Sequence, residues 1–197
     1  TGFGRTGALF ACQHEDVVPD ILALSKGLTA GYLPLAVTLT HERIYQGFLG
    51  AYAEFKTFFH GHSYTGNQVG CATALASLDL FEQDQTLQTL PPRIAHLAHR
   101  LDRLFQTHDT VMDVRQCGFI AAVELCASRA EGLEFAFTEK MGAKFCLAMR
   151  EKGIWIRPLG NTIVIVPPLI TTEAQLDFLL DTMEETLANF PNTGALA

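Results

Sequence analysis

Lys26 is the residue whose sequence surroundings most favour covalent chemistry. It follows the short apolar run at residues 21–24, and a second run rich in apolar and β-branched residues covers positions 35–40. We expect Lys26 to lie between two buried strands, where partial desolvation favours the neutral amine. A neutral lysine amine can form a Schiff base with an aldehyde. The alternative, a solvated lysine that merely flanks a strand, stays open from the residues alone.

A loop-like segment centred on Gly61 is the second candidate, because Gly61 separates His60 from His62. Two imidazoles at this spacing could bind a metal ion, but no third ligand stands at a suitable position along the chain. The hydroxyls of Ser63 and Thr65 instead precede a run with helical spacing. Backbone N–H groups at a helix N-terminus attract anions such as phosphate. We therefore favour an anion site here and expect no bound metal.

Two arginines are candidates for binding a carboxylate. Arg157 follows the strand-like run at residues 154–156 and precedes Pro158, and a guanidinium there can bind a substrate carboxylate through two hydrogen bonds. An ion pair with an internal acidic residue is the alternative. Arg5 lies in a glycine-rich segment without G-x-G-x-x-G spacing or a terminal Lys-Ser/Thr, so neither a dinucleotide site nor a P-loop is expected. Taken alone, this segment is typical of a turn with one exposed arginine.

The first part of the chain, residues 1–90, is expected to be an α/β unit. Its strands cover residues 21–24 and 35–40. An Ala- and Leu-rich run from 69 to 81 predicts a helix, and Asn67 is placed to act as its N-cap. The candidate anion segment would therefore lead directly into this helix.

The second part, residues 91–197, is expected to be a small α+β unit. Pro91 and Pro92 are expected to open an amphipathic helix that leaves three arginines in solvent, namely Arg93, Arg100 and Arg103. The later elements are expected in this order: strands at 111–114 and 119–125, a helix at about 138–152 ended by Gly153, strands at 154–156 and 163–166, and a helix after a capping box at Thr172.

Composition excludes several classes of partner. The 197 residues carry 14 basic and 21 acidic side chains, for a net charge of −7, and form no basic stripe for nucleic acid. The longest apolar run, at 163–170, is interrupted by two prolines, whereas a membrane helix needs about twenty residues. Five cysteines without a C-x-x-C pair fit buried reduced thiols. We expect a cytoplasmic protein without nucleic-acid or membrane partners, whose first residue lies inside a longer chain.

Three segments resemble the class III aminotransferases, which are fold-type I enzymes dependent on pyridoxal phosphate. They are Thr1-Gly2-Phe3-Gly4-Arg5-Thr6-Gly7, Pro19-Asp20-Ile21, and Leu24-Ser25-Lys26-Gly27-Leu28 followed by Gly31. Residues 59–67 and 153–158 are similar to the branch of this class that acts in biotin synthesis. The resemblance implies a fold-type I transferase in which residues 1–90 are the C-terminal part of the cofactor-binding large domain and residues 91–197 the C-terminal small domain.

The resemblance also implies roles in binding pyridoxal phosphate. Lys26 would be the catalytic residue that binds the cofactor and moves a proton during the reaction. Ser63 would bind the cofactor phosphate of the neighbouring subunit, and His62 would lie in the same cofactor-binding loop. The protein would therefore be a homodimer with its active site at the interface.

For the substrates, the resemblance implies contacts with Gly61, Arg157 and Arg5. In the biotin branch the amino group of S-adenosylmethionine passes through the cofactor to 8-amino-7-oxononanoate, and Arg157 matches the position that holds the carboxylate of this ketone. Val164 stands where some relatives have a tyrosine in the substrate pocket.

Two alternative functions stay open. One is another class III aminotransferase that acts on an ω-amine such as ornithine, acetylornithine or 4-aminobutyrate. The other is a truncated remnant without catalysis, because the family's aspartate for the pyridine nitrogen would precede Thr1. We expect the chain to be the C-terminal half of the enzyme, and the isolated half to be inactive.

Overall fold

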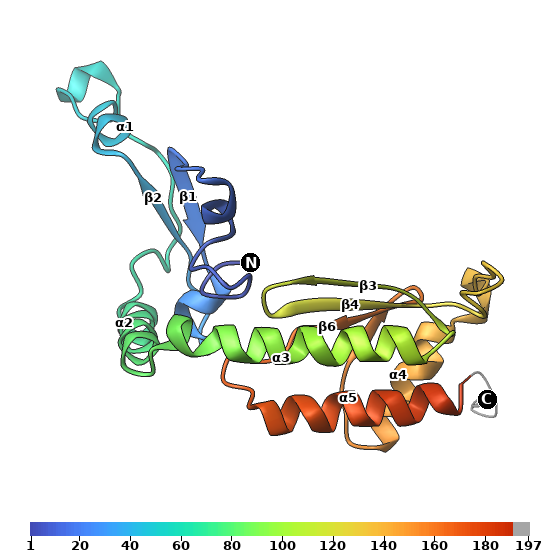
Figure 1. Ribbon diagram of the computed structural model, residues 1–197. Coiled ribbons are helices and arrows are strands. Elements are labelled where there is room, and N and C mark those ends of the chain that lie inside the picture. The colour runs from blue at the N-terminus through green and yellow to red at the C-terminus, as the bar shows by residue number, and fades with distance from the viewer. Residues whose placement is uncertain (191–197) are drawn as a thin grey trace. The chain divides into compact units, whose positions relative to one another are not determined.

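The computed structural model describes residues 1–190, which divide into two compact units. Unit 1 contains Thr1–Phe3 and Ala8–Thr86, and unit 2 contains Gly4–Gly7 together with the residues from Leu87 onward. The short segment Gly4–Gly7 therefore belongs to a different unit from the residues on either side of it. Figure 1 shows the helices and strands of both units.

Unit 1 is built around a pair of antiparallel strands. β1 (Ile21–Leu24) pairs with β2 (Val37–Thr40), so that Leu24 lies opposite Val37. The strand expected at 21–24 is confirmed, and the second strand begins two residues later than expected. The other short elements of unit 1 are the 3-10 helices η1 (Ala11–Glu15), η2 (Lys26–Thr29) and η3 (Tyr52–Glu54), and the α-helix α1 (Glu42–Gln46).

Helix α2 (Gln68–Gln83) packs against η2 and confirms the helix expected at 69–81. Asn67 is its N-cap, as predicted, because the Asn67 Oδ1 accepts a hydrogen bond from the Gly70 N–H at 2.8 Å. The buried apolar residues of this unit form one small cluster: Phe3, Leu28 and Ala74.

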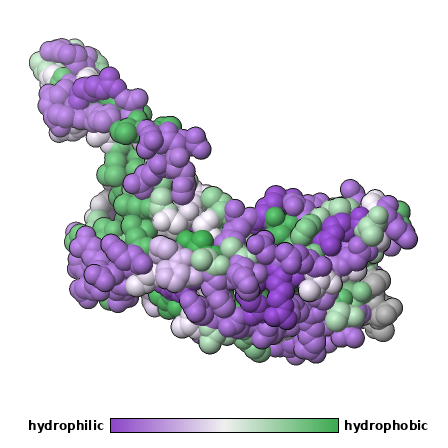
Figure 2. Space-filling model, viewed as in Figure 1, coloured by the Kyte–Doolittle hydropathy of each residue, from purple (hydrophilic) through white to green (hydrophobic). Residues whose placement is uncertain are grey.

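The strands of unit 1 are more exposed than the sequence predicts. Ile21 is 59% exposed and Leu39 is 51% exposed, and Figure 2 shows apolar residues at the surface in the region of β1 and β2. A pair of strands has two open edges and two faces, and so small a core covers little of that area. The expectation that Lys26 lies between buried strands is therefore wrong for this chain, because Lys26 is exposed.

Unit 2 is a four-stranded antiparallel sheet with helices packed on one face. Its strands are β3 (Val111–Cys117), β4 (Ile120–Leu125), β5 (Arg157–Leu159) and β6 (Thr162–Ile165), in the order β3-β4-β6-β5. Its helices are α3 (Thr86–Thr107), the 3-10 helix η4 (Phe137–Glu139), α4 (Met141–Glu151) and α5 (Glu173–Ala188). Alternate residues of β4 are buried, which places the helix-covered core on one side of the sheet. The expected α+β arrangement is confirmed.

Several elements of unit 2 differ from the expectations, and β3 extends to Cys117 instead of ending at residue 114. The strand expected at 154–156 is wrong: these residues lie outside any strand, and β5 covers Arg157–Leu159 instead. The Ile154 N–H donates to Met149 O at 3.0 Å, so residue 154 completes the end of α4. Helix α3 begins at Thr86, so Pro91 and Pro92 lie inside it instead of opening it. Each proline lacks an N–H group, so the helix forgoes two hydrogen bonds near its start.

The expectation that three arginines of α3 face solvent holds for Arg103, whose side chain is 60% exposed. Arg100 is buried and forms ion pairs with Asp177 and Asp181 of α5. Arg93 is half-buried and donates hydrogen bonds to the segment that precedes α5. Helical periodicity predicts which face a residue lies on, but a long arginine side chain at the edge of that face can reach a partner on another element.

The cysteines are less buried than their sequence pattern predicts. Cys126 and Cys146 are buried, Cys12 is half-buried, and both Cys71 and Cys117 are exposed, with all five thiols free. Burial raises the pKa of the Cys146 thiol to about 11. No helix in the described part of the chain is long and apolar enough to cross a membrane.

The ion pairs between α3 and α5 predict a loss of stability in acid. Hydrogen bonds from His96, at 2.8 Å, and from Arg100 lower the pKa of Asp177. A lowered carboxyl pKa contributes stability that is fully present above the unfolded-state value of about 3.9 and is lost as the pH falls through the folded-state value. We expect the urea midpoint to fall as the pH drops below about 4, and to fall less in Asp177→Asn. An unchanged pH dependence in Asp177→Asn would contradict this prediction.

Candidate active site

Hydrogen bonds of the main chain hold Lys26 at the exit of β1. Lys26 is the first residue of η2 and has a φ angle of 52°, in the left-handed region that non-glycine residues rarely adopt. The Leu28 N–H donates to Ser25 O at 3.2 Å, and the Gly31 N–H donates to Lys26 O at 3.2 Å. Uncommon backbone conformations persist where surrounding contacts fix them, and they are frequent at functional sites.

The side chain of Lys26 has no partner within residues 1–190, where its amine makes neither a hydrogen bond nor an ion pair. A lysine amine that is not held by a carboxylate is available to a ligand that carries an aldehyde. The structure therefore supports the accessibility that Schiff-base chemistry needs, although it does not show the desolvation that we expected from the neighbouring strands.

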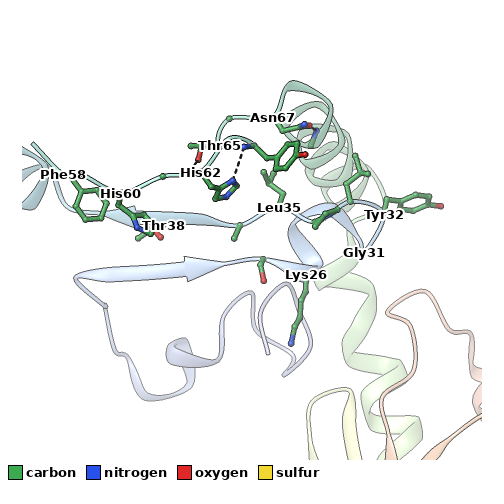
Figure 3. Close-up of a pocket in the computed structure, with 18 residues that line it drawn as sticks. Lys26, Gly31, Tyr32, Leu35, Thr38, Phe58, His60, His62, Thr65 and Asn67 are labelled. Carbon is green, nitrogen blue, oxygen red and sulfur yellow. Dashed lines mark hydrogen bonds between the residues drawn. The ribbon is translucent and has the colours of Figure 1, made fainter.

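A cavity of about 1360 Å³ in unit 1 adjoins Lys26. It is lined by Lys26, by residues 31–36 and by residues between 58 and 67, including Gly61 and His62. Ser63 does not line this cavity. Figure 3 shows the Lys26 side chain directed away from His60, His62 and Thr65. Within one copy of the chain, the lysine amine and the candidate anion segment therefore face different directions.

The candidate anion segment holds its shape through its own hydrogen bonds. The His62 N–H donates to the Thr65 Oγ1 at 3.0 Å, and the Tyr64 N–H donates to the His62 Nδ1 at 3.1 Å. The Asn67 N–H donates to Tyr64 O at 3.2 Å and so leads the segment into α2. Ser63 is exposed, and its hydroxyl has no partner in the part of the chain that the structure describes. A shaped turn with a free hydroxyl is suited to binding an anion.

Arg157 lies on the sheet face that the helices do not cover. Across the strands, Arg157 is opposite Val164, Val164 is opposite Ala122, and Ala122 is opposite Arg115. Residues directly opposite one another present their side chains on the same face of a sheet. An arginine therefore stands at each end of this row, and the two differ in their partners.

Arg115 is neutralised within the chain, whereas Arg157 is not. Arg115 forms ion pairs with Asp113 at 2.6 Å and with Glu124 at 2.8 Å. Arg157 is exposed and has no ion pair or hydrogen bond from its side chain among the described residues. The internal ion pair that we considered as the alternative for Arg157 is therefore absent from residues 1–190, which leaves its guanidinium free for an external carboxylate.

Arg5 is half-buried and is fixed at both its main chain and its side chain. The Phe119 N–H donates to Arg5 O at 2.9 Å, and the Arg5 Nη1 donates to the carbonyl oxygen of Pro167. Burial lowers the pKa of the Arg5 guanidinium. Within residues 1–190 no carboxylate pairs with it, and its N–H groups other than the one bound to Pro167 O have no partner. The expectation of an exposed turn arginine is wrong, because the segment packs into unit 2.

The structure thus groups the six candidate residues by unit. Lys26, Gly61 and His62 line one cavity of unit 1, Ser63 belongs to the same segment outside that cavity, and Arg5 and Arg157 belong to unit 2. Sequence reasoning missed Arg93, which donates to Leu169 O, and Gln116, which donates to Ile94 O and Gly118 O. No periodicity or motif identifies them, because their partners lie far away along the chain.

Comparisons with known proteins show the family of the chain. A family model described as aminotransferase class-III matches residues 1–187. Proteins named adenosylmethionine-8-amino-7-oxononanoate aminotransferase are similar to this chain, at 55% identity in Geobacter sulfurreducens and 44% in Methanocaldococcus jannaschii. These two alignments cover 94% and 95% of this chain and 41% of each relative. The chain therefore spans about two fifths of the length of the curated relatives it matches.

Solved structures show the same likeness. The crystal structure of the Methanocaldococcus jannaschii protein of that name is 42% identical, with a TM-score of 0.88, over 95% of this chain and 44% of the solved chain. A thermostable (S)-enantioselective omega-transaminase from Thermomicrobium roseum is 34% identical, with a TM-score of 0.86, over 96% of this chain and 41% of the solved chain.

Proposed function

Since the chain belongs to the class-III aminotransferases, we propose that the whole protein transfers the amino group of S-adenosylmethionine to 8-amino-7-oxononanoate, giving 7,8-diaminononanoate for biotin synthesis. The names of relatives at 44% to 55% identity support these substrates. Membership of the family also confirms the predicted fold, a fold-type I transferase of which this chain spans a part. In that fold, unit 1 would be the C-terminal part of the large domain and unit 2 the small domain.

The residues present fit pyridoxal phosphate as the cofactor. The Lys26 amine has no internal partner and can bind the aldehyde, and the Ser63 hydroxyl and the turn at His62 can bind the phosphate. When bound, this cofactor supplies an electron-withdrawing ring that stabilises negative charge at the carbon that loses its proton. Lys26 would move that proton with its Nζ atom, which acid–base catalysis requires to lie within hydrogen-bond reach of the reacting carbon.

The opposite directions of Lys26 and the His62 segment support a homodimer. If each cofactor is held by Lys26 of one subunit and Ser63 of the other, a single chain need not bring both groups together. Two copies would then complete two equivalent sites related by a two-fold axis. We place this dimer in the cytoplasm, with no nucleic-acid or membrane partner, in agreement with the acidic composition.

The free guanidinium of Arg157 is the observation that favours a substrate with a carboxylate. Among such substrates, the names of the relatives favour 8-amino-7-oxononanoate. The position of Arg157 opposite Val164 on the uncovered sheet face leaves it able to make a bidentate contact with a carboxylate. The carboxylate of 8-amino-7-oxononanoate is suited to this contact. Arg5, with N–H groups that no internal residue uses, would lie at the substrate side of the site, and Gly61 would leave room for the substrate beside its segment.

An ω-transaminase is the second candidate function, favoured by the structural likeness to the Thermomicrobium roseum enzyme. It would transfer the amino group of an ω-amine such as ornithine, acetylornithine or 4-aminobutyrate. The 197 residues span about two fifths of the length of the curated relatives, and we expect no turnover from this part of the protein alone.

The full-length protein tests the proposal in an assay with S-adenosylmethionine and 8-amino-7-oxononanoate. We expect turnover of this pair, and we expect Arg157→Met to raise the KM for the ketone by roughly 30-fold or more, because a charged contact is lost. Arg115→Met is the matched control, because Arg115 stands in the same row but binds Asp113 and Glu124 instead. Its KM should stay close to that of the unmodified protein.

Two results would overturn this proposal. Turnover of ω-amino acids with 2-oxoglutarate but not of 8-amino-7-oxononanoate would select the second candidate function. An unchanged KM for the ketone in Arg157→Met, with turnover of the unmodified protein intact, would overturn the proposed role of Arg157 in binding the carboxylate.

A further inference from the structure

The segment between β6 and α5 depends on donors from elsewhere in unit 2. It contains Pro167 and Pro168, neither of which has an N–H group to donate. Within the segment, the Thr171 N–H donates to Pro168 O at 3.0 Å. The carbonyl oxygens of Pro167, Leu169 and Thr171 accept instead from arginine side chains. Buried or half-buried carbonyl groups need such partners, so these arginines determine where the segment lies.

Arg93 supplies two of these contacts and is itself held on α3. Its Nη1 donates to Leu169 O and, at 3.4 Å, to Thr171 O. Its Nε donates to Thr89 O at 3.0 Å, and its Nη2 donates to the Thr89 Oγ1 at 2.8 Å. The planar fork of the guanidinium is therefore engaged on two sides, which restricts its orientation in a way that a lysine ammonium could not match.

Arg5 supplies the third contact, through Pro167 O, from the other side of the same segment. Its main chain is fixed at the turn between β3 and β4, where the Phe119 N–H donates to Arg5 O at 2.9 Å. Arg5 thus depends on two supports, the β3–β4 turn for its backbone and the segment at 167–171 for its guanidinium.

Gln116 closes the connection back to α3. Its Nε2 donates to Ile94 O at 3.1 Å and to Gly118 O at 2.9 Å. Ile94 is the residue after Arg93, and Gly118 precedes Phe119. These hydrogen bonds therefore form a continuous network. It links α3 to the segment at 167–171, that segment to Arg5, Arg5 to the β3–β4 turn, and the turn back to α3.

We propose that Arg93 is a positioning residue that holds Arg5 in place for substrate by fixing the carbonyl oxygen of Pro167. Arg93 acts through the segment at 167–171 and does not itself touch the substrate. This inference rests on the proposed function, in which Arg5 lies at the substrate side of the site. Losing Arg93 frees Leu169 O and Thr171 O, and the neighbouring Pro167 O is then no longer presented to the Arg5 guanidinium.

The test uses full-length protein and measures KM and kcat for each substrate separately. Arg93→Met keeps the length of the side chain but removes its donors, and we expect it to raise KM about tenfold for the substrate whose KM rises in Arg5→Met. We expect kcat to change much less. The double variant Arg5→Met/Arg93→Met should match Arg5→Met alone, because a residue that acts through Arg5 has no effect once Arg5 is gone.

Two further variants complete the design. Arg103→Met is the matched control, because Arg103 also lies on α3 but contacts Glu184 at 3.5 Å, and its KM values should not change. Arg93→Lys retains the positive charge and serves as the second variant if Arg93→Met does not fold. It should also raise KM, because an ammonium lacks the planar fork of the guanidinium, but by less than Arg93→Met, because some donors remain.

Hydrogen exchange separates this inference from the proposed function. In Arg93→Met, the Phe119 amide should exchange faster, because its acceptor on Arg5 is less firmly held. If the unmodified protein does not turn over the proposed substrates, the proposed function fails, and faster exchange at Phe119 would still support the positioning of Arg5. Unchanged exchange, unchanged KM values for both substrates, or additive effects in the double variant would each overturn the inference.

Discussion

Lys26→Ala in the full-length protein is expected to lower transamination by at least about a thousandfold, because both covalent attachment of the cofactor and proton transfer use this amine. The visible absorbance of cofactor bound to the protein through lysine should disappear as well. The exposed amine without an internal partner supports this expectation, since its removal breaks no ion pair or hydrogen bond within residues 1–190. Folding should therefore be preserved, and the loss should be one of chemistry.

Lys56→Ala is the matched control for this experiment. Lys56 also belongs to unit 1, but its amine forms an ion pair with Glu54 at 2.5 Å and it does not line the cavity beside Lys26. Its absorbance spectrum and turnover should resemble those of the unmodified protein. Retained absorbance in Lys26→Ala would show that the cofactor is attached elsewhere, and Lys26 would then be the solvated lysine that the residues alone left open.

Gly118→Ala is expected to cost about 3–5 kcal/mol of stability, because it combines backbone strain with a steric clash. Gly118 has a φ angle of 57°, a region that alanine adopts at a cost. A Cβ atom there would also lie 2.1 Å from the backbone carbonyl carbon of Thr6 and 2.5 Å from the Gly7 nitrogen. Because both contacts are with backbone atoms, the Gly4–Gly7 segment would have to move away from the β3–β4 turn.

Gly132→Ala separates the cost of backbone strain from the cost of the steric clash. Gly132 has a similar φ angle of 66°, but a Cβ atom there would meet no atom within 4 Å. The strain alone should cost about 1–2 kcal/mol. Urea midpoints of the two variants, followed by circular dichroism, should therefore differ clearly, with Gly118→Ala the less stable. Equal midpoints would show that the Gly4–Gly7 segment does not pack as closely as the structure indicates. Gly118→Ala should also raise KM, since it displaces Arg5.

Local signals in the sequence determined several elements correctly. The short apolar run at 21–24 became β1, the Ala- and Leu-rich run became α2 with Asn67 as its cap, and Thr172 caps α5. Each of these elements depends on residues that are close together in the sequence, so the local sequence is enough to predict it. Gly153, with a φ angle of 88°, likewise ends α4 as its position predicts.

The family also followed from the sequence alone, because the segment around Lys26 and the segment around Arg5 keep an order and spacing that a family model matches over residues 1–187. The exposure of the two strands beside Lys26 did not follow. Apolar runs predict burial only where another part of the protein covers them, and the buried core of unit 1 is small.

The surroundings of the arginines were decided by tertiary structure. Arg5 and its acceptor Pro167 are 162 positions apart, Arg93 and Leu169 are 76 apart, and Arg100 and Asp177 are 77 apart. Periodicity along α3 placed Arg93 and Arg100 toward solvent, because it describes one helix and cannot represent a partner from another element. Some arginines bind partners within the fold, whereas the guanidinium of Arg157 stays free for a carboxylate. This difference depends on contacts that form only when distant segments of the chain pack together.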